Sequence, residues 1–162
     1  MRIGILSDTH DQLARTRNAV RALEAAGAEA IIHCGDLVSA PIVEACSLLT
    51  CWFVLGNQDS DNVPELEDAA VTHGVCCLGW GGIVEQAGKR IGVVHGHLRK
   101  ERRRILLLQP DYLLSGHTHN AGDTLDGAVR RINPGALHRA RIYTVAVLDL
   151  DSDELKFLEI GA

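Results

Sequence analysis

The strongest constraint on the fold is an alternation of strand-like and helix-like segments in the first third of the chain. We expect strands at Arg2–Leu6, Ala30–His33 and Cys51–Leu55, separated by helices at Leu13–Ala26 and Pro41–Leu49. Amphipathic periodicity identifies the first helix, and Gly27 is suited to end it. Strands joined by helical crossovers run parallel, because a parallel pair needs a long connection. This part of the chain therefore predicts an α/β fold.

From about Gly74 onward the pattern is richer in short strands. We expect a hairpin of Gly82–Gln86 and Arg90–His95 turning at Ala87–Lys89, a helix at Arg99–Gln109 closed by Pro110, and a strand at Asp111–Leu114. A second hairpin, Thr124-Leu125 with Val129–Ile132, is expected around Asp126-Gly127, and a final strand pair at Tyr143–Leu150 and Glu154–Ile160. These elements predict two packed sheets with helices outside. The 162 residues suit a single domain, 1–162, with its own core.

Composition narrows the classes of function. We expect a soluble cytoplasmic protein, because no secretory signal and no membrane-length apolar run is apparent. The net charge of −5 gives no broad basic footprint, so nucleic acid is not the expected partner. The five cysteines form no C-x-x-C pair and are interpreted as buried reduced thiols.

Five polar clusters follow apolar strands and carry the functional signal. They are Asp8-Thr9-His10, Gly35-Asp36, Gly56-Asn57-Gln58-Asp59, His95-Gly96-His97 and Gly116-His117-Thr118-His119. Asp8 and His10 are two residues apart, so an extended backbone would point both side chains to one face, and the same spacing recurs in the last cluster. Glycines beside four clusters would let backbone come close to a ligand.

The residue types in these clusters favour a transition-metal site. Mixed imidazole and carboxylate donors suit Mn²⁺, Fe²⁺ or Zn²⁺ better than Ca²⁺, which prefers oxygen ligands. One such cluster alone is more often a turn or a hydrogen-bonded structural histidine than a metal site. Five of them in order would be costly without something to bind. His33, His73 and His138 have no partner pattern and are interpreted as structural.

The order D-x-H, G-D, G-N-x-D, H-G-H, G-H-x-H resembles the calcineurin-like metallophosphoesterase superfamily. The short length and Asn133-Pro134-Gly135 resemble its small bacterial and archaeal phosphodiesterase branch. The resemblance implies a four-layer α-β-β-α sandwich with two mixed sheets. It also implies a phosphoesterase, acting more on diesters than on monoesters of small molecules.

The resemblance further implies a ligand set for two divalent cations. One cation would be held by Asp8, His10, Asp36 and His119, and the other by Asp36, Asn57, His95 and His117. Asp36 would bridge them. Two such cations clamp a phosphoryl group and activate water for in-line attack. Mn²⁺ is the expected metal, with Fe²⁺, Zn²⁺ and Ni²⁺ as alternatives.

One position departs from the family pattern. Many members have a histidine after the Asn of G-N-x-D that is thought to protonate the leaving group, whereas this chain has Gln58. Glutamine cannot serve as a general acid near neutral pH, and the small branch often lacks this histidine too. His97 is the candidate proton donor, with orientation of ligands or phosphate as its alternative role. Asn57 and His97 are expected to contact substrate, and Asp59 to support its loop.

Two other functions remain open from the sequence. A small retromer subunit of this fold serves mainly as a protein-binding scaffold, but it is altered at the G-D and G-N positions that Asp36 and Asn57 occupy here. A nuclease is the third interpretation, which salt-sensitive DNA binding would support. The basic run Arg99–Arg104 could face an anionic substrate or form a solvated helix face. A homo-oligomer is compatible with a small enzyme of this kind.

Overall fold

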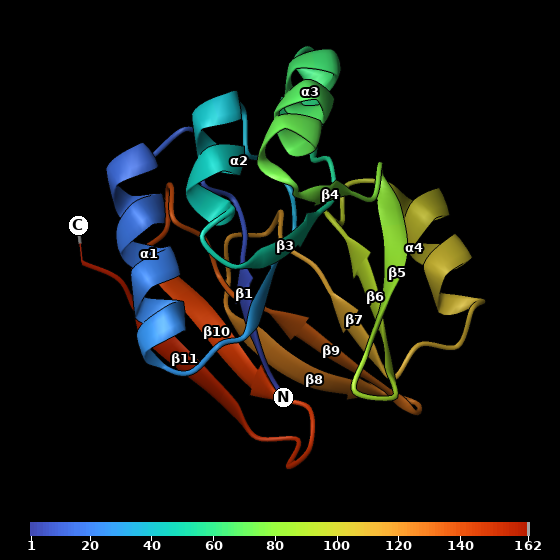
Figure 1. Cartoon of the computed structure of the whole chain (residues 1–162). Coiled ribbons are helices and arrows are strands. Elements are labelled where there is room, and N and C mark those ends of the chain that lie inside the picture. The colour runs from blue at the N-terminus through green and yellow to red at the C-terminus, as the bar shows by residue number, and fades with distance from the viewer. Residues whose placement is uncertain (162) are drawn as a thin grey trace.

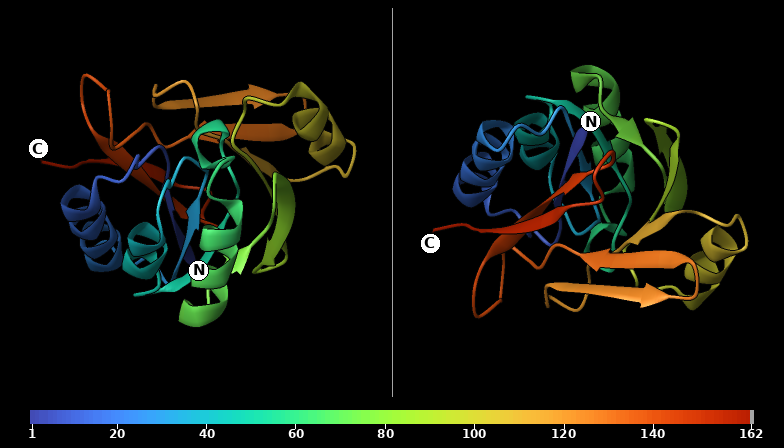
Figure 2. Two further views of the ribbon diagram at one scale, coloured as in Figure 1. Left: turned by 90° about the horizontal axis from the view of Figure 1, so that it is seen from above. Right: turned by 90° about the horizontal axis from the view of Figure 1, so that it is seen from below.

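The computed structural model describes residues 1–161 and arranges them in four layers. Two β-sheets form the inner layers, with three helices covering one sheet and a fourth helix covering the other (Figures 1 and 2). This is the α-β-β-α sandwich that the sequence predicts.

The first sheet has six strands. In spatial order they are β11 (Leu155–Glu159), β10 (Thr144–Asp149), β1 (Arg2–Leu6), β2 (Ala30–His33), β3 (Thr50–Phe53) and β4 (Cys76–Cys77). The strands β1 to β4 run parallel, whereas β10 pairs antiparallel with β1 and β11 pairs antiparallel with β10. The sheet is therefore mixed, and its parallel part comes from the alternating segments at the start of the chain.

The second sheet has five strands and is also mixed. In spatial order they are β5 (Gly81–Gln86), β6 (Lys89–Val94), β7 (Tyr112–Leu114), β9 (Val129–Asn133) and β8 (Gly122–Asp126). The central strands β6, β7 and β9 run parallel, and the two outer strands form antiparallel hairpins with their neighbours. The carboxyl ends of the three parallel strands consequently lie at one edge of this sheet.

Three hydrophobic clusters fill the three spaces between the four layers. The helices are α1 (Leu13–Ala25), α2 (Ala40–Cys46), α3 (Val63–His73) and α4 (Arg99–Leu106), with a short 3-10 turn, η1, at Asn57–Asp59. Leu23, Val43 and Leu66 pack from α1, α2 and α3 against the first sheet. Ile5 and Val93 meet between the sheets, and Ile105 packs from α4 against the second sheet. The central strands of each sheet are thus buried on both faces, whereas the outer strands β8 and β11 are largely exposed.

One helix was missed in the sequence. No element was assigned between η1 and Gly74, where α3 covers the first sheet beside α2 (Figure 1). Its signals were present: Pro64 lies in the first turn, Gly74 ends the helix at φ 66°, and Leu66, Ala69 and Ala70 are buried at helical spacing. The two-residue strand β4 that follows this helix was not predicted either.

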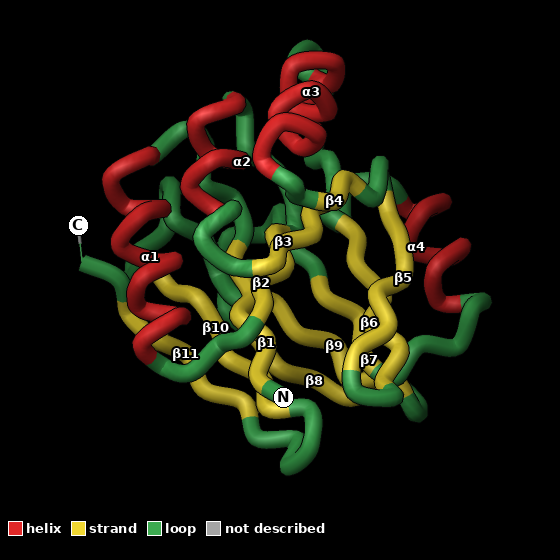
Figure 3. The backbone as a smooth tube through the Cα atoms, viewed as in Figure 1, coloured by secondary structure: helices red, strands yellow, loops and turns green. Residues whose placement is uncertain are grey.

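Most other differences concern boundaries. The helices expected at Pro41–Leu49 and Arg99–Gln109 end earlier, at Cys46 and Leu106. In the second hairpin Asp126 pairs with Val129, so the turn is made by Gly127 and Ala128 rather than by Asp126-Gly127. The loops that connect the elements are drawn in green in Figure 3.

The thiols only partly follow the expectation of burial. Cys34, Cys46 and Cys51 are buried, but Cys76 is exposed and Cys77 is half-buried on β4. Across residues 1–161, no helix is long and apolar enough to cross a membrane.

Candidate metal centre

Asp8 lies directly beyond the carboxyl end of β1 and is fully buried. Its Oδ2 atom accepts hydrogen bonds from the Ser7 hydroxyl at 2.6 Å and from the His117 backbone N–H at 3.0 Å. Its Oδ1 atom has no hydrogen-bond partner among the described residues. That oxygen lies 3.2 Å from Nε2 of His119 and 3.7 Å from Nε2 of His10. The hydrogen bonds to Oδ2 therefore hold the carboxylate in place, while Oδ1 faces the two imidazoles.

Asp36 repeats this arrangement beyond the end of β2. Its Oδ1 accepts a hydrogen bond from the Gln58 backbone N–H at 2.9 Å. Its Oδ2 lies 3.3 Å from Nε2 of both His10 and His95. Burial disfavours the charged carboxylate, but the imidazoles of His10 and His95 outweigh this and hold the pKa of Asp36 well below its usual range. Asp36 therefore faces both sides of the cluster.

Asp59 holds the two loops that carry Asp36 and Asn57. Its Oδ2 accepts hydrogen bonds from the backbone N–H of Asp36 at 2.9 Å and of Gly56 at 2.8 Å, and its Oδ1 accepts one from Val38 at 2.7 Å. This fully buried side chain has the loop-supporting place expected for it.

His95 is oriented from behind by the first sheet. Its Nδ1 donates to the Cys34 carbonyl at 2.8 Å, which leaves Nε2 pointing at Asp36 and at Oδ1 of Asn57, 3.1 Å away. A backbone carbonyl on the far nitrogen is the usual way to fix the tautomer of a metal-binding histidine. Burial alone would lower the pKa of His95, but Asp36 and Asp8 raise it.

His10 and His119 close the other side of the cluster. Their rings meet edge to face with centroids 5.4 Å apart, and His119 Nδ1 lies 3.4 Å from the Arg139 carbonyl. Burial lowers the pKa of His10, but the carboxylates of Asp36 and Asp8 raise it to about 9. The carboxylates thus attract positive charge strongly enough to protonate a neighbouring imidazole.

The remaining imidazoles lie around the rim. The His117 ring is 5.1 Å from that of His95, and the His97 ring is 5.3 Å from His95 and 6.1 Å from His117. Trp80 meets His97 edge to face at 5.8 Å. Burial, together with His95 and His117, lowers the pKa of His97. The H-G-H and G-H-x-H clusters therefore come together with the acidic clusters, as the strand order predicts.

The local backbone differs from the expectation. The argument from spacing assumed extended backbone at Asp8–His10 and His117–His119, and this was wrong. The values of φ are 53° at Asp8, 40° at His10, 69° at His117 and 59° at His119, and Asp36 has 60°. Left-handed conformations cost non-glycine residues about 1–3 kcal/mol each and cluster at functional sites. The side chains converge through tight turns that the surrounding hydrogen bonds maintain.

The neighbouring glycines also act differently from expectation. A Cβ on Gly56 would lie 2.1 Å from Asp36 Oδ1, and one on Gly35 would lie 2.7 Å from the His95 ring. A Cβ on Gly116 would lie 1.9 Å from the Ser7 hydroxyl and 2.5 Å from Asp8 Oδ2. These glycines make room for the site's own side chains rather than for a ligand.

The donors fit divalent cations. Two groups offer ligand atoms within 4.8 Å of one another: Asp8, His10 and His119, and Asp8, Asp36 and His95. Buried Asp8 Oδ1 and His10 Nε2 have no hydrogen-bond partner among the residues described, although buried polar atoms rarely go without one. A cation held between them would satisfy both atoms. Asn57 lies at the edge of the second group through its contact with His95.

Two histidines interpreted as structural have different places. His33 is fully buried, accepts a hydrogen bond from the Gly35 N–H at 3.1 Å and contacts the Thr9 hydroxyl at 3.1 Å, as a structural residue would. Burial lowers its pKa to about 3. His138 instead stacks near His10, with ring centroids 4.8 Å apart. No motif marks His138; the only nearby signal is Asn133-Pro134-Gly135, which turns the chain back toward the site.

Comparisons with known proteins agree with the fold and the cluster. Residues 1–153 match the model of the calcineurin-like phosphoesterase superfamily domain. Phosphodiesterase MJ0936 of Methanocaldococcus jannaschii is 28% identical over 96% of this chain and 97% of its own. Probable metallophosphoesterase MJ0623 of the same organism is 33% identical over 95% of this chain and 77% of its own. The solved structure of an archaeal phosphodiesterase is 27% identical and superposes with a TM-score of 0.87 over 98% of this chain and 99% of that one. The chain belongs to the calcineurin-like phosphoesterase superfamily, in its small archaeal and bacterial branch.

The fold is also shared with Vps29. The structure of a Vps29 variant from Entamoeba histolytica is 16% identical and has a TM-score of 0.66, covering 99% of this chain and 100% of that one. At this identity the likeness concerns the fold alone.

Proposed function

We propose that this protein is a divalent-metal-dependent phosphodiesterase. The observation that carries the proposal is the pair of buried carboxylates, Asp8 and Asp36, each held by one oxygen while the other faces imidazoles. The similarity to phosphodiesterases over nearly the whole chain supports the choice of reaction. Asp36 and Asn57, altered in the scaffold subunit of the same fold, are both in place and favour chemistry over scaffolding.

The residues that would hold two cations follow from the cluster. Asp8, His10 and His119 would hold one, and Asn57, His95 and His117 the other, with Asp36 between them because its Oδ2 faces both His10 and His95. Such cations would lower the pKa of water and neutralise charge on the phosphate oxygens. The family resemblance favours Mn²⁺, and the mixed nitrogen and oxygen donor set also suits the alternatives Fe²⁺, Zn²⁺ and Ni²⁺.

The chain's own groups would orient the ester. Asn57 can donate its amide N–H to a phosphate oxygen while its Oδ1 faces His95. His97 lies on the same side, against Trp80, and its buried Nδ1 has no partner among residues 1–161. We assign His97 to the leaving-group oxygen. Because its pKa is lowered, the neutral imidazole favours a hydrogen-bonding role over a strongly acidic one.

A variant separates these two roles of His97. If His97 donates the proton, His97→Ala should lose about 10²-fold or more in rate on a diester with a poor leaving group and little on one that leaves as p-nitrophenolate. Equal losses on both esters would assign His97 to phosphate orientation alone.

The proposed function is tested with metal-stripped protein and two esters. Hydrolysis of bis-p-nitrophenyl phosphate should require added Mn²⁺ and exceed hydrolysis of p-nitrophenyl phosphate. Cleavage of neither ester by protein shown to bind two metals would contradict the proposal and favour the scaffold interpretation.

A further inference from the structure

A shallow hollow of about 270 Å³ adjoins the cluster on the His119 side. Its walls come from two loops that are distant in sequence, the segment that follows His119 and the segment that leads into β10. The first contributes Asn120 and Ala121, and the second contributes Arg141 and Ile142. Because His119 is one of the proposed metal ligands, the hollow adjoins the proposed position of the phosphate.

A network of hydrogen bonds holds the buried floor of the hollow. Thr144 lies there and donates its hydroxyl to the Pro134 carbonyl at 2.8 Å. The next residue, Gly135, donates its N–H to Oδ1 of Asn133 at 2.9 Å, and Nδ2 of Asn133 donates to the Thr118 hydroxyl at 3.0 Å. The floor is thereby tied to the loop that carries His117 and His119, so an arm bound in the hollow has a fixed position relative to the phosphate.

The polar groups around the hollow are free to bind. Arg141, Glu159 and Asn120 are exposed, and the part of the chain that the structure describes shows no ion pair or side-chain hydrogen bond for any of them. Arg141 and Glu159 line the same hollow without reaching the 4.0 Å of an ion pair. Ile142, which is 53% exposed, adds an apolar wall.

These groups recognise a particular kind of chemistry. A guanidinium only donates hydrogen bonds, a carboxylate only accepts them, and an amide does both. Their charges cancel, so the hollow does not favour a second phosphate, and the Glu159 carboxylate would repel one. A flat heterocycle with donors and acceptors on its edge and an apolar face against Ile142 matches the set. A nucleobase has these properties.

We propose that this hollow binds the nucleoside arm of the substrate, so that the enzyme prefers diesters in which one ester arm is a nucleoside. The inference rests on the proposed phosphodiesterase function and names its substrate class. His97 and Trp80 lie beside His95 and His117, whereas the hollow lies beside His119 and His10. The leaving arm accordingly departs on the His97 side, and the nucleoside stays with the phosphate on the His119 side.

The test compares two diesters with the same leaving group. With Mn²⁺-loaded full-length protein, kcat/KM for thymidine 5′-(p-nitrophenyl phosphate) should exceed that for methyl p-nitrophenyl phosphate. In Arg141→Gln the preference should fall about 10-fold, which is what loss of one hydrogen bond to a charged group costs. The rate on the methyl ester should stay unchanged. Calorimetry should show thymidine 5′-phosphate binding weakened by the same factor.

Arg103→Gln is the matched control. Arg103 is an exposed arginine on α4 that has no side-chain partner within the described residues and does not line this hollow. It should leave the preference for the nucleoside ester unchanged. Hydrolysis of both esters with no preference, or a preference that survives in Arg141→Gln, would overturn the inference and leave the phosphodiesterase intact. Failure to hydrolyse either ester or bis-p-nitrophenyl phosphate would overturn the proposed function itself.

Discussion

The two edges of the sandwich both carry aspartates, and they leave these carboxylates in different states. At the carboxyl ends of the central parallel strands, Asp8 Oδ1 and His10 Nε2 are buried without a hydrogen-bond partner in the described structure. At the opposite edge, Asp153 accepts a hydrogen bond from the Tyr112 hydroxyl at 2.6 Å and forms an ion pair with Arg130 at 2.8 Å. One edge leaves buried polar atoms without a hydrogen bond, and the other satisfies its charged groups with hydrogen bonds and ion pairs.

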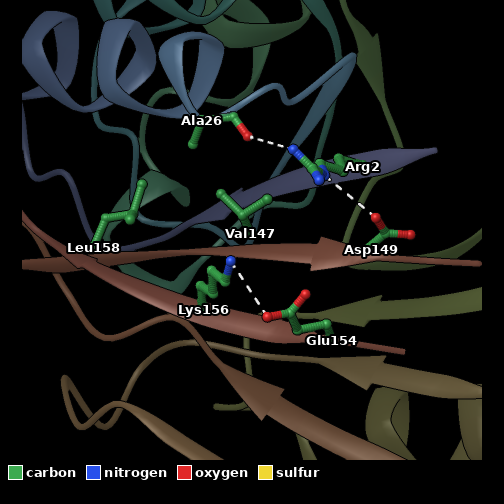
Figure 4. A pocket seen from close by; sticks show the side chains of 7 residues that line it. All are labelled: Arg2, Ala26, Val147, Asp149, Glu154, Lys156 and Leu158. Atoms are coloured by element: carbon green, nitrogen blue, oxygen red, sulfur yellow. Dashed lines mark hydrogen bonds and ion pairs between the residues drawn. The ribbon is translucent and has the colours of Figure 1, made fainter. Parts of the chain in front are cut away.

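A small cavity at the opposite edge is also lined by charged groups that have partners. It has a volume of about 50 Å³ and is lined by residues of β1, β10 and β11 and the loop after α1 (Figure 4). Arg2 donates to the Ala26 carbonyl and to Asp149, and Lys156 pairs with Glu154. The charged groups of this cavity thus have partners within the protein, so the cavity is interpreted as structural.

The difference shows how a functional cluster can be recognised. Burying charge without a partner is costly, and proteins accept that cost where binding recovers it. At the metal-centre edge, hydrogen bonds to Ser7, Gln58 and Cys34 hold one atom of each ligand while the other atom faces its neighbours. Variants at both edges therefore test whether this difference separates functional from structural clusters.

Asp36→Asn should have the largest effect on function. It removes the charge that faces His10 and His95 while keeping the shape of the side chain. Removing a residue that only hydrogen-bonds to a metal ligand lowers activity by up to roughly 100-fold. Asp36 is itself a proposed ligand, so we expect turnover of bis-p-nitrophenyl phosphate to fall by more than this. Elemental analysis should show fewer than two bound metals. Asp68→Asn, the same change at an exposed site on α3, is the control and should match wild type. Full activity in Asp36→Asn would remove the basis for the metal assignment.

Gly116→Ala should damage both stability and activity. The added Cβ would lie 1.9 Å from the Ser7 hydroxyl and 2.5 Å from Asp8 Oδ2, so the Asp8 carboxylate must shift. Overpacking of this kind costs about 1–3 kcal/mol, and misplacing a catalytic group by about 1 Å can cost on the order of 100-fold in rate. Thermal melts and kcat on the diester measure the two losses.

Gly122→Ala provides the contrast for that variant. No heavy atom lies within 4 Å of a Cβ at Gly122, so both the melting temperature and kcat should stay at wild-type values. A harmless Gly116→Ala would show that Asp8 can move without consequence.

Mn²⁺ should stabilise the metal-free protein. A ligand at 100 times its Kd adds about 2.7 kcal/mol to the free energy of unfolding. For a protein of this size that raises Tm by roughly 5–10 °C. Asp36→Asn should show a smaller rise, because the cation would lose a charged ligand. An identical rise in both proteins would place the bound Mn²⁺ elsewhere.

Hydrophobic periodicity predicted the alternating first part of the chain and the strand-rich second part, because it is a local signal, and strand-end position indicated where the five clusters would gather. The family resemblance implied the four layers. The sequence did not predict the order of the strands within each sheet, because strand pairing joins segments that are distant along the chain. It could not predict the left-handed turns at Asp8 and His117, since these are maintained by hydrogen bonds between distant segments. For the same reason the sequence could not predict that His138 lies beside His10, because this depends on the path of the chain after Asn133-Pro134-Gly135. The ligand assignments stay predictions until a metal is bound and measured.

Tyr112→Phe should have the smallest effect, confined to stability. The Tyr112 hydroxyl is the first of the causes that lower the pKa of Asp153. The ionised Asp153 therefore stabilises the folded state above the carboxyl's ordinary pKa, and this contribution disappears as pH falls through the lowered value. Loss of one hydrogen bond of about 1 kcal/mol should reduce Tm by roughly 2–4 °C at pH 7 and by less in acid.

Tyr143→Phe is the control for that hydroxyl. Within residues 1–161 the Tyr143 hydroxyl forms no hydrogen bond. Its ring makes a cation-π contact with Arg15, whose Cζ lies 3.8 Å from the ring centroid. Its melting temperature should not depend on pH differently from wild type. Both variants should keep full activity on the diester, because neither hydroxyl forms a hydrogen bond with a metal-centre residue in the part of the chain that the structure describes. If Tyr112→Phe lost activity instead, the two edges would be coupled, and paired charge could no longer be used to separate structural from functional clusters.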